Sequence, residues 1–512
     1  MKATRLCNSS RFTLAILAFL AFFNFYSLRI NMSMTIVCMV NHTAILPRDT
    51  ETYGNITSVK NTDCAELDLN HSRSANGSES RLEDGEFVWD KESQGLIHGS
   101  LFWGYIVTNL AGGILATRYG GKHVIGLSLL LAAVLTILVP VVSRASIIGL
   151  MVLRFLTGAA QGFVSPAMQS LWTHWAPPLE SSRLRSFCFA GSQVAKVITY
   201  PISGLLCEYG FDGGWPSVFY LQGLIGILWY IAWTFLVFDS PAQHPRISAE
   251  ERIYIETSLE GIVTTNHKKQ PPWHSIWTSV PVWAIIVAHT CSNWGEYTFL
   301  TNMPTYIKEV LHFDIKKNGL FSSVPYLAVW VVITSSSWLA DLVRSKKWLS
   351  TTGTRKLFNS IGKLLPAAMM ICISFVDCSQ PELAMILLTL GISLTGFQYG
   401  GGLYMNAGDI APSYAGVIYG ISNTAATIPG FLAPLTIGLL TPDQTQHQWR
   451  MVFYISAAIY VFGTVVFVAF SDGNLQAWAA EQTSLGVLEP DETLELKDIR
   501  AADSSEGQSN KC

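Results

Sequence analysis

Charged residues are scarce in this chain. Of its 512 residues, 13% are charged and 50% are hydrophobic, whereas roughly 25% of the residues of an ordinary soluble domain are charged. This deficit is typical of a protein that lies largely within a lipid bilayer, and the composition excludes collagen, coiled coils and disordered chains. The net charge of −3 also lacks the basic excess that neutralises the phosphates of nucleic acid. We therefore expect a bilayer protein without a nucleic-acid partner.

The sequence also lacks the motifs of enzymes and metalloproteins. Its nine cysteines form no CxxC pair and no Cys/His zinc spacing, and no nucleophile–base set or phosphate-binding loop is recognisable. We expect no enzyme, no metal site and no cofactor. Most cysteines lie in apolar runs, where a thiol packs as a small hydrophobic group. The candidates for a disulfide on an oxidising side are Cys64 in a polar loop and Cys38 or Cys378 near helix ends.

Twelve apolar segments are long enough to cross a bilayer, since a spanning helix needs about 20 residues. Six precede a polar stretch and six follow it. The segments are 12–40, 94–117, 123–142, 147–172, 187–208, 217–238, 280–303, 319–342, 357–376, 383–406, 414–438 and 451–470. The sequence predicts an all-α membrane protein of 12 transmembrane helices in two six-helix halves.

These segments define the expected domains. They are an N-terminus (1–11), a first half (12–238) with a loop at 41–93, a central loop (239–279), a second half (280–470) and an acidic tail (471–512) that we expect to be disordered. Within the central loop, Ser248 followed by Glu251 is a capping box, which predicts the start of a short helix.

Short-loop lysines and arginines indicate the orientation. They gather on one set of faces, at Arg118 and Lys122 and again at Arg344 and Lys347, and such faces are cytosolic. Both termini are then cytosolic, and the acidic loop 41–93 is lumenal or extracellular. That loop carries N-glycosylation sequons at Asn41, Asn55, Asn70 and Asn76.

One loop motif occurs once in each half. GGILATRYGGK (112–122) and SSWLADLVRSKK (336–347) both resemble the cytosolic gate motif of the major facilitator superfamily, which combines a glycine, an acid and basic residues. The first copy has Thr117 where the acid is expected, whereas the second keeps Asp341. The motif residues are Gly113, Arg118, Gly120, Lys122, Asp341 and Arg344.

Longer strings resemble one branch of that superfamily, the anion transporters that include sialin, the vesicular glutamate transporters and the type I sodium–phosphate cotransporters. Sialin is the most similar of these. The strings are IHGSLFWGYIVTNLAGG, WAPPLESSRL, SPAQHPRIS, NGLFSSVPYL and DIAPSYAGVIYGISNT, and the resemblance covers residues 11–478.

The resemblance implies a monomeric secondary transporter that moves a small anion by alternating access, with the major facilitator fold and no cofactor. Sialic acid or an acidic amino acid competes with phosphate as the substrate, and the coupling ion is H⁺ or Na⁺. An anion channel or a transport-dead sensor is the alternative from another class. The tails carry no clear sorting signal, so lysosome, vesicle and plasma membrane remain open.

Two arginines lie at bilayer depth, where an ionisable group is costly and is a functional candidate. Arg29, close to Tyr26 in the first span, offers a planar fork for a carboxylate or phosphate, and the resemblance implies an anion site there. Arg154 lies in the fourth span. The family clusters glutamates beside it at positions that hold Thr157 and Gln161 here, so the resemblance leaves proton coupling through this helix in doubt.

The seventh span carries a polar stripe of His289, Ser292, Asn293 and Glu296 at i, i+3, i+4 and i+7. Glu296 is the single acid well inside any span. Our hypothesis is that it takes over the coupling or gating role lost at Gln161; the alternative is a neutralising partner for Arg29 or Arg154. Lys196 in the fifth span either extends the anion site or pairs with Glu296.

Other polar residues carry weaker signals. His98 in the second span is either a pH sensor or a packing group, and Lys363 in the ninth is expected to reach the cytosolic interface. Gln398 and Asn406 in the tenth span are candidate substrate ligands. The glycines around them either let the backbone approach substrate or serve helix packing; they are Gly396, Gly400, Gly401 and Gly402.

Overall fold

The computed structural model describes residues 9–41, 44, 85–259, 271–311, 313–376 and 379–479. Its helices begin where the sequence supplies caps: Ser9 Oγ accepts from Phe12 N and Ser146 Oγ accepts from Gly149 N. The first half contains α1 (Ser10–Met39), α4 (Lys91–Tyr119), α5 (Gly121–Ala145), α6 (Ile147–Gly162), α7 (Val164–Trp175), α8 (Pro178–Tyr209) and α9 (Trp215–Leu236).

The second half repeats this plan. It contains α13 (Val280–Glu309), α14 (Ile315–Ser345), α15 (Thr351–Ile373), α16 (Pro381–Leu394), α17 (Gly396–Gly400), α18 (Leu403–Ile410), η2 (Pro412–Tyr414), α19 (Ala415–Ala425), α20 (Ile428–Leu440) and α21 (Gln446–Phe470). Three spans are interrupted: α6 with α7, α16 with α17 and α18, and α19 with α20. Between the halves lie η1 (Pro241–Gln243), α10 (Ala249–Leu259) and α12 (Trp273–Thr278).

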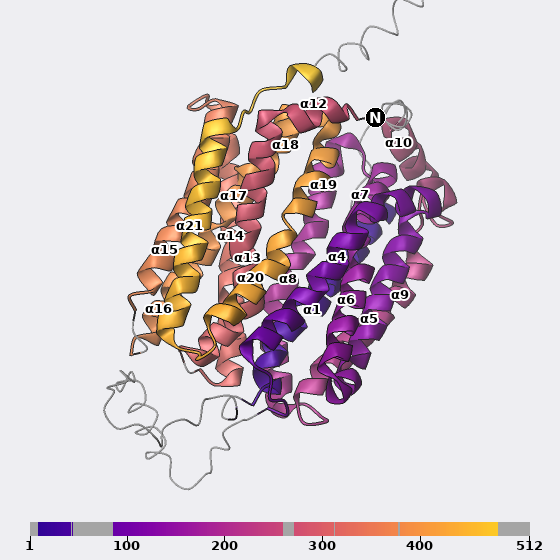
Figure 1. Ribbon diagram of the computed structural model, residues 1–512. Helices are drawn as coiled ribbons and strands as arrows, with labels where there is room; N and C mark the ends of the chain where they lie inside the picture. The colour runs from indigo at the N-terminus through magenta and orange to yellow at the C-terminus, as the bar shows by residue number, and fades with distance from the viewer. Residues whose placement is uncertain are drawn as a thin grey trace, which may run out of the picture.

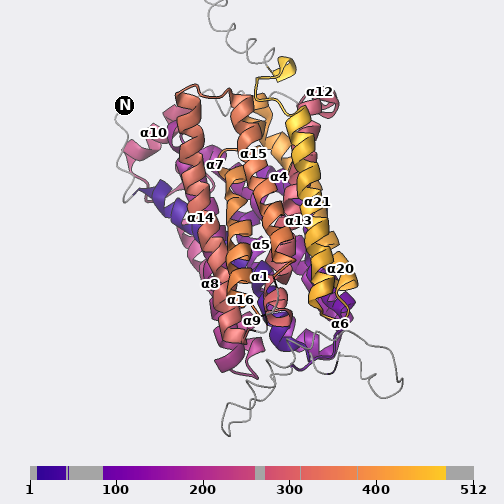
Figure 2. The ribbon, with the colours of Figure 1, turned by 90° about the vertical axis from the view of Figure 1, so that its left-hand side faces the viewer.

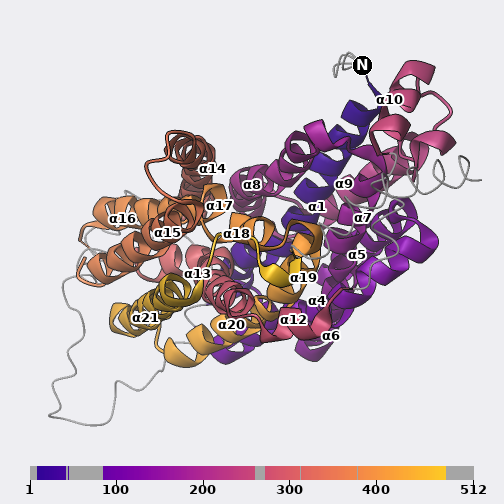
Figure 3. The same ribbon diagram turned by 90° about the horizontal axis from the view of Figure 1, so that it is seen from above.

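Helices of both halves account for the 12 expected spans. In the described part of the chain, nine are long and apolar enough to cross a membrane by composition alone. The remaining spans are α4, α8 and α13, and each carries ionisable residues at bilayer depth. These helices lie where the halves meet: α4 packs against α20, α8 against α14 and α1 against α13. Figure 2 shows α14 beside α8, and Figure 3 shows the two halves from above.

The two ends of the bundle differ in how their cores are built. In Figure 1 the upper end carries α10 and α12. At the lower end α1 ends at Met39, α4 begins at Lys91 and α13 ends at Glu309. Near the lower end one hydrophobic core joins the halves, including Met39 from the first and Met303 from the second. Toward the upper end each half has a core of its own. The protein is therefore closed at the lower end, with its halves separated at the upper end.

Large apolar side chains face outward on both halves, as a lipid environment requires. They include Val141 and Phe235 in the first half and Trp338 and Phe462 in the second, each more than half exposed.

Three expectations are corrected, in whole or in part. The disulfide joins Cys38 to Cys207, with a Cα–Cα distance of 6.3 Å. Cys38 was among the predicted candidates, whereas Cys207 was not, because only the packing of α1 against α8 brings it beside Cys38. Cys64 and Cys378 lie outside the described residues. The capping box correctly predicts the start of a short helix, α10. The box is only half formed, because Glu251 N donates to Ser248 Oγ while the Glu251 carboxylate binds Arg11.

The beginning of the tail is ordered rather than disordered. Gly473 N donates to Thr352 Oγ1 and Gln476 N donates to the carbonyl of Ile410, so residues 471–479 pack on the second half. Residues 480–512 lie outside the described residues.

Candidate functional site

Arg29 and Arg154 lie together in the first half, buried to 6% and 3% exposure. The guanidinium of Arg29 lies over aromatic rings, 4.5 Å from the centre of Phe25 and 4.6 Å from that of Tyr105, and its Nε donates weakly to Gln161 Oε1 at 3.4 Å. Arg154 Nη2 donates to the carbonyl of Arg29 at 3.4 Å. Within the described residues neither arginine has an acidic partner, and Arg29 Nη2 and Arg154 Nε lack any hydrogen-bond partner.

Lys196, on α8, pairs with Glu296, on α13, at 3.0 Å. The idea that Glu296 neutralises Arg29 or Arg154 is therefore wrong in this conformation, because α8 brings an amine closer to the acid than either guanidinium. The other carboxylate oxygen accepts from the Tyr399 hydroxyl. The pair links the two halves at mid-depth.

The polar stripe of α13 faces the other helices of the second half. His289 Nδ1 lies 3.1 Å from Ser422 Oγ, Ser292 Oγ donates to Gln398 Oε1 at 2.7 Å, and Asn293 Nδ2 donates to the carbonyl of Ala426 at 2.9 Å. Tyr404 stacks on Tyr399 with ring centres 4.2 Å apart and donates to Asn293 Oδ1. The stripe is thus held by α17, α18 and α19.

A central cavity lies between the halves. Gln193 and Lys196 from α8 line it on one side, and residues of α13, α14, α16, α17 and α21 line the rest. Among these are Glu296, Tyr326, Gln398 and Tyr399. Tyr26 connects the cavity with the arginines, since its ring lies 5.1 Å from Lys196 Nζ and 5.5 Å from the Arg29 guanidinium carbon.

Three candidate residues lie apart from this cluster. Asn406 Nδ2 donates to the carbonyl of Asp472 at 2.7 Å, near the upper end. His98 is buried on α4, within electrostatic reach of Arg154 and Lys91. Lys363 does not reach the interface: it is fully buried and its Nζ donates to the carbonyl of Ala288 at 2.7 Å.

This organisation matches known transporters. The model of the Major Facilitator Superfamily matches residues 14–434. The chain belongs to the major facilitator superfamily. Two solved structures share the fold. The D-xylose–proton symporter has a TM-score of 0.63 and 15% identity, covering 91% of this chain and 99% of that chain. A bacterial homologue of the human lysosomal transporter Spinster has a TM-score of 0.61 and 12% identity, covering 88% of this chain and 95% of that chain.

Relatives of higher identity place the chain within a family of this superfamily. Human sialin is 42% identical over 93% of this chain and 92% of its own length. Vesicular glutamate transporter 3 of Danio rerio is 38% identical over 94% of this chain and 77% of its own length. A Drosophila melanogaster protein that is proposed, by its name, to be an inorganic phosphate cotransporter is 39% identical over 92% of this chain and 87% of its own length. The chain is an integral membrane protein and a transporter, not an enzyme.

Three ion pairs, one at the lower end and two at the upper end, were not predicted from the sequence. Lys91 on α4 pairs with Glu309 on α13, and Trp449 Nε1 donates to Glu309 at 3.3 Å. Both charges lie in predicted loops, and nothing in their spacing relates them. At the upper end Arg11 is fully buried against Glu180 and Glu251. These contacts seal the lower end across the halves and fasten α10 to the first half.

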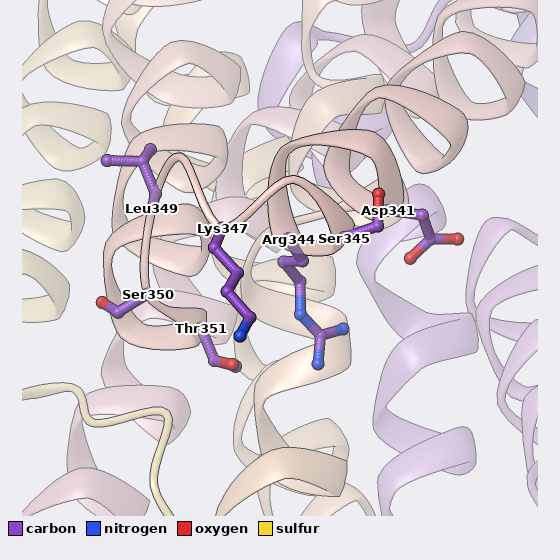
Figure 4. A pocket seen from close by; sticks show the side chains of 7 residues that line it. All are labelled: Asp341, Arg344, Ser345, Lys347, Leu349, Ser350 and Thr351. Atoms are coloured by element: carbon purple, nitrogen blue, oxygen red, sulfur yellow. The ribbon is translucent and has the colours of Figure 1, made fainter.

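The gate motif of the superfamily has two different environments. In the first copy Gly113 and Arg118 lie in α4, and Lys122 N donates to Asp239 Oδ1 at 2.7 Å. Gly120 has a φ of 87°, and a Cβ there would lie 2.5 Å from the Asp239 carboxylate, so glycine is required. In the second copy Asp341 and Arg344 line a pocket between α14 and α15 (Figure 4). There they form no ion pair within the described residues.

The glycines of the tenth span serve helix packing, one of the two suggested roles. A Cβ on Gly400 would lie 2.1 Å from Ser336 Oγ and one on Gly402 would lie 2.9 Å from Asn359 N, so α14 and α15 pack closely here. The span also breaks at these positions, between α17 and α18.

Of the sequons, Asn41 is described. Its N donates to the carbonyl of Phe87 and its Oδ1 accepts from Ala44 N, at the lower end. Asn55, Asn70 and Asn76 lie outside the described residues.

Proposed function

We propose that this transporter carries a small anion across a membrane by alternating access, with Arg29 and Arg154 as its anion site. The observation that carries the proposal is the pair of buried guanidiniums that have no acidic partner among the described residues. Leaving a buried charge unpaired costs several kcal/mol, and an anion that bridges them offsets this cost. The relatives support an anionic substrate by their names.

The polar surroundings favour a substrate class. Ser292 and Gln398 line the second-half side of the central cavity with hydrogen-bonding groups, and Asn293 lies beside Ser292 on the same helix. Tyr26 lies between Arg29 and Lys196. These groups suit the hydroxyls or amide of an organic acid such as sialic acid or an acidic amino acid. A second candidate, inorganic phosphate, is favoured by charge: Arg29, Arg154 and Lys196 face one acid, Glu296, and this excess matches a multiply charged anion.

We propose that the upper end is cytosolic, as are both termini, and that the lower end is lumenal or extracellular. The Cys38–Cys207 disulfide at the lower end supports this orientation, because disulfides persist on oxidising sides of membranes. The relatives' names favour a lysosomal or vesicular membrane. Asn41 and the other sequons then face the side of the membrane where glycans are added. We also propose that the protein works as a monomer.

In the same scheme the halves open alternately around the central cavity. Gly113, Gly120 and Lys122 in the first half, with Asp341 and Arg344 in the second, form the cytosolic gate when the upper end closes. Glu296 and Lys196 line the cavity and respond to bound substrate. His289, His98 and Gln161 are accessory groups for coupling transport to H⁺ or Na⁺.

Uptake into proteoliposomes tests this function. Labelled sialic acid, glutamate and phosphate are offered with pH, sodium and voltage gradients imposed singly. We expect saturable uptake of at least one anion and counterflow after preloading. Ohmic current without counterflow would instead identify a channel, and absence of both would identify a sensor. Empty liposomes and a variant lacking both guanidiniums, Arg29→Gln/Arg154→Gln, provide the controls.

A further inference from the structure

Lys196 and Glu296 differ in their access to the central cavity. The Lys196 side chain is 3% exposed, whereas 25% of the Glu296 side chain is accessible. Both line the cavity, and each comes from a different half. The amine is thus buried in the wall, and the acid is the member of the pair that is partly accessible.

Two aromatic rings hold Lys196 in place independently of Glu296. Its Nζ lies 5.1 Å from the centre of the Tyr26 ring on α1 and 5.2 Å from that of the Tyr326 ring on α14. A cation over an aromatic face is attracted by the ring quadrupole. Glu296 likewise keeps a partner if it leaves Lys196, since Tyr399 donates to its other oxygen.

The carboxylate of Glu296 is the same chemical group as the acid of an organic anion. An entering anion that approaches Lys196 meets Glu296 already bound there, and two carboxylates on one ammonium leave an uncompensated negative charge. Like charges at one site favour protonation of one of them. Displacement of Glu296 and its neutralisation are therefore linked steps.

We propose that Glu296 is an internal stand-in for the substrate: it occupies Lys196 in the empty transporter, the anion displaces it, and the displaced carboxylate binds one proton. This inference rests on the proposed anion transport and assigns H⁺ as its coupling ion. The Lys196–Glu296 hydrogen bond breaks, a Lys196–anion bond forms, and an O–H bond forms at Glu296 with a proton from the water of the open side. Lys196 keeps its charge, so one proton enters per anion bound.

Other titratable groups surround Glu296. His289 lies two turns earlier on the same helix and is the one that titrates near neutral pH by its ordinary chemistry. The others within electrostatic reach are tyrosines of several helices: Tyr26, Tyr297, Tyr326, Tyr399, Tyr404, Tyr419 and Tyr460. His289 is therefore the competing proton acceptor that the test must separate.

The test measures anion binding and proton uptake by the purified full chain in weak buffer with a pH indicator. Sialic acid and glutamate are the probes, because their carboxylates stay ionised near neutral pH. In the wild type we expect about one proton taken up per anion and weaker binding as pH rises. Glu296→Gln removes the competitor, so we expect binding on the order of tenfold tighter, no proton uptake and no pH dependence. Glu382→Gln, an exposed acid at the start of α16, is the matched control and should behave as wild type.

Two further variants keep the test decisive. Lys196→Met/Glu296→Gln removes both charges. It should therefore lack the tighter anion binding expected of Glu296→Gln alone, and it should take up no proton. His289→Gln should keep proton uptake if Glu296 is the acceptor. The inference is overturned if folded Glu296→Gln binds no more tightly than wild type or still takes up a proton, if the double variant keeps the gain in affinity or takes up a proton, or if His289→Gln abolishes proton uptake. If the wild type binds and transports none of the anions offered, the proposed function itself fails.

Discussion

At the scale of residues, the strongest constraint on function is the two guanidiniums that lack an acidic partner in the described part of the chain. Arg29 is held by aromatic rings and one weak hydrogen bond to Gln161, not by a carboxylate, and Arg154 depends on a backbone carbonyl. Rings stabilise the cation without satisfying its donors, so Arg29 Nη2 is buried without a hydrogen-bond partner among the described residues. The Lys196–Glu296 pair, in contrast, is satisfied until a competitor arrives.

Arg29 substitutions test this availability. Arg29→Gln removes the charge and should reduce anion uptake at least about tenfold, in line with the cost of deleting one member of a buried charge pair. Arg29→Lys keeps the charge but loses the planar fork, so it should retain part of the rate with a raised KM. Initial uptake rates over a range of anion concentrations measure both. Arg252→Gln, in an exposed pair with Glu256, is the control; equal effects of Arg29→Gln and Arg252→Gln would refute the assignment.

At the scale of elements, helix crossings depend on glycine. α4 and α6 approach so closely that a Cβ on Gly158 would lie 1.8 Å from the carbonyl oxygen of Leu101, and one on Gly104 would lie 1.9 Å from that of Phe155. Backbone atoms cannot move aside as a flexible side chain does. The crossing must therefore widen if either glycine gains a side chain.

Gly158→Ala should lower the stability of the protein by about 1–3 kcal/mol, the usual cost of overpacking. Gly420→Ala is the matched substitution, because nothing lies within 4 Å of its Cβ position on α19; alanine there should be neutral or stabilising by up to about 1 kcal/mol. Thermal unfolding of the purified proteins, followed by intrinsic fluorescence, measures the difference. Similar unfolding temperatures for the two variants would contradict this account of the crossing.

The membrane-spanning helices were predictable from the sequence because each forms a long apolar segment. The stripe of α13 was also predictable, because His289 and Glu296 follow helical periodicity. Their partners were not, since they lie on helices whose packing no local pattern reports. Lys363 shows the limit: the expected span began at residue 357, but α15 begins at Thr351, which places Lys363 about 18 Å into the helix. The Lys91–Glu309 pair depends on two chain segments meeting across the halves, which no spacing indicates.

At the scale of the whole molecule, the closed lower end defines the motion. The shared core there is reinforced by cross-half contacts: Ser33 Oγ donates to the carbonyl of Thr301 at 2.7 Å, and the Tyr200 hydroxyl donates to the carbonyl of Leu300 at 2.7 Å. Because the cores toward the upper end are separate, each half can move as a unit. Opening the lower end must break these contacts together, whereas the Cys38–Cys207 bond lies within one half and does not oppose the motion.

A designed disulfide across the lower half tests this motion. The Cβ position of Gly99 on α4 lies 3.4 Å from Cβ of Phe431 on α20, close to the roughly 3.5–4.5 Å between the Cβ atoms of a disulfide. Oxidised Gly99→Cys/Phe431→Cys should lose uptake because the halves cannot separate there, and a reductant should restore it. The wild type under both conditions controls for the Cys38–Cys207 bond, and each single variant controls for the substitutions. Full uptake by a fully cross-linked protein would show that α4 and α20 stay together throughout transport, and that the lower end opens elsewhere.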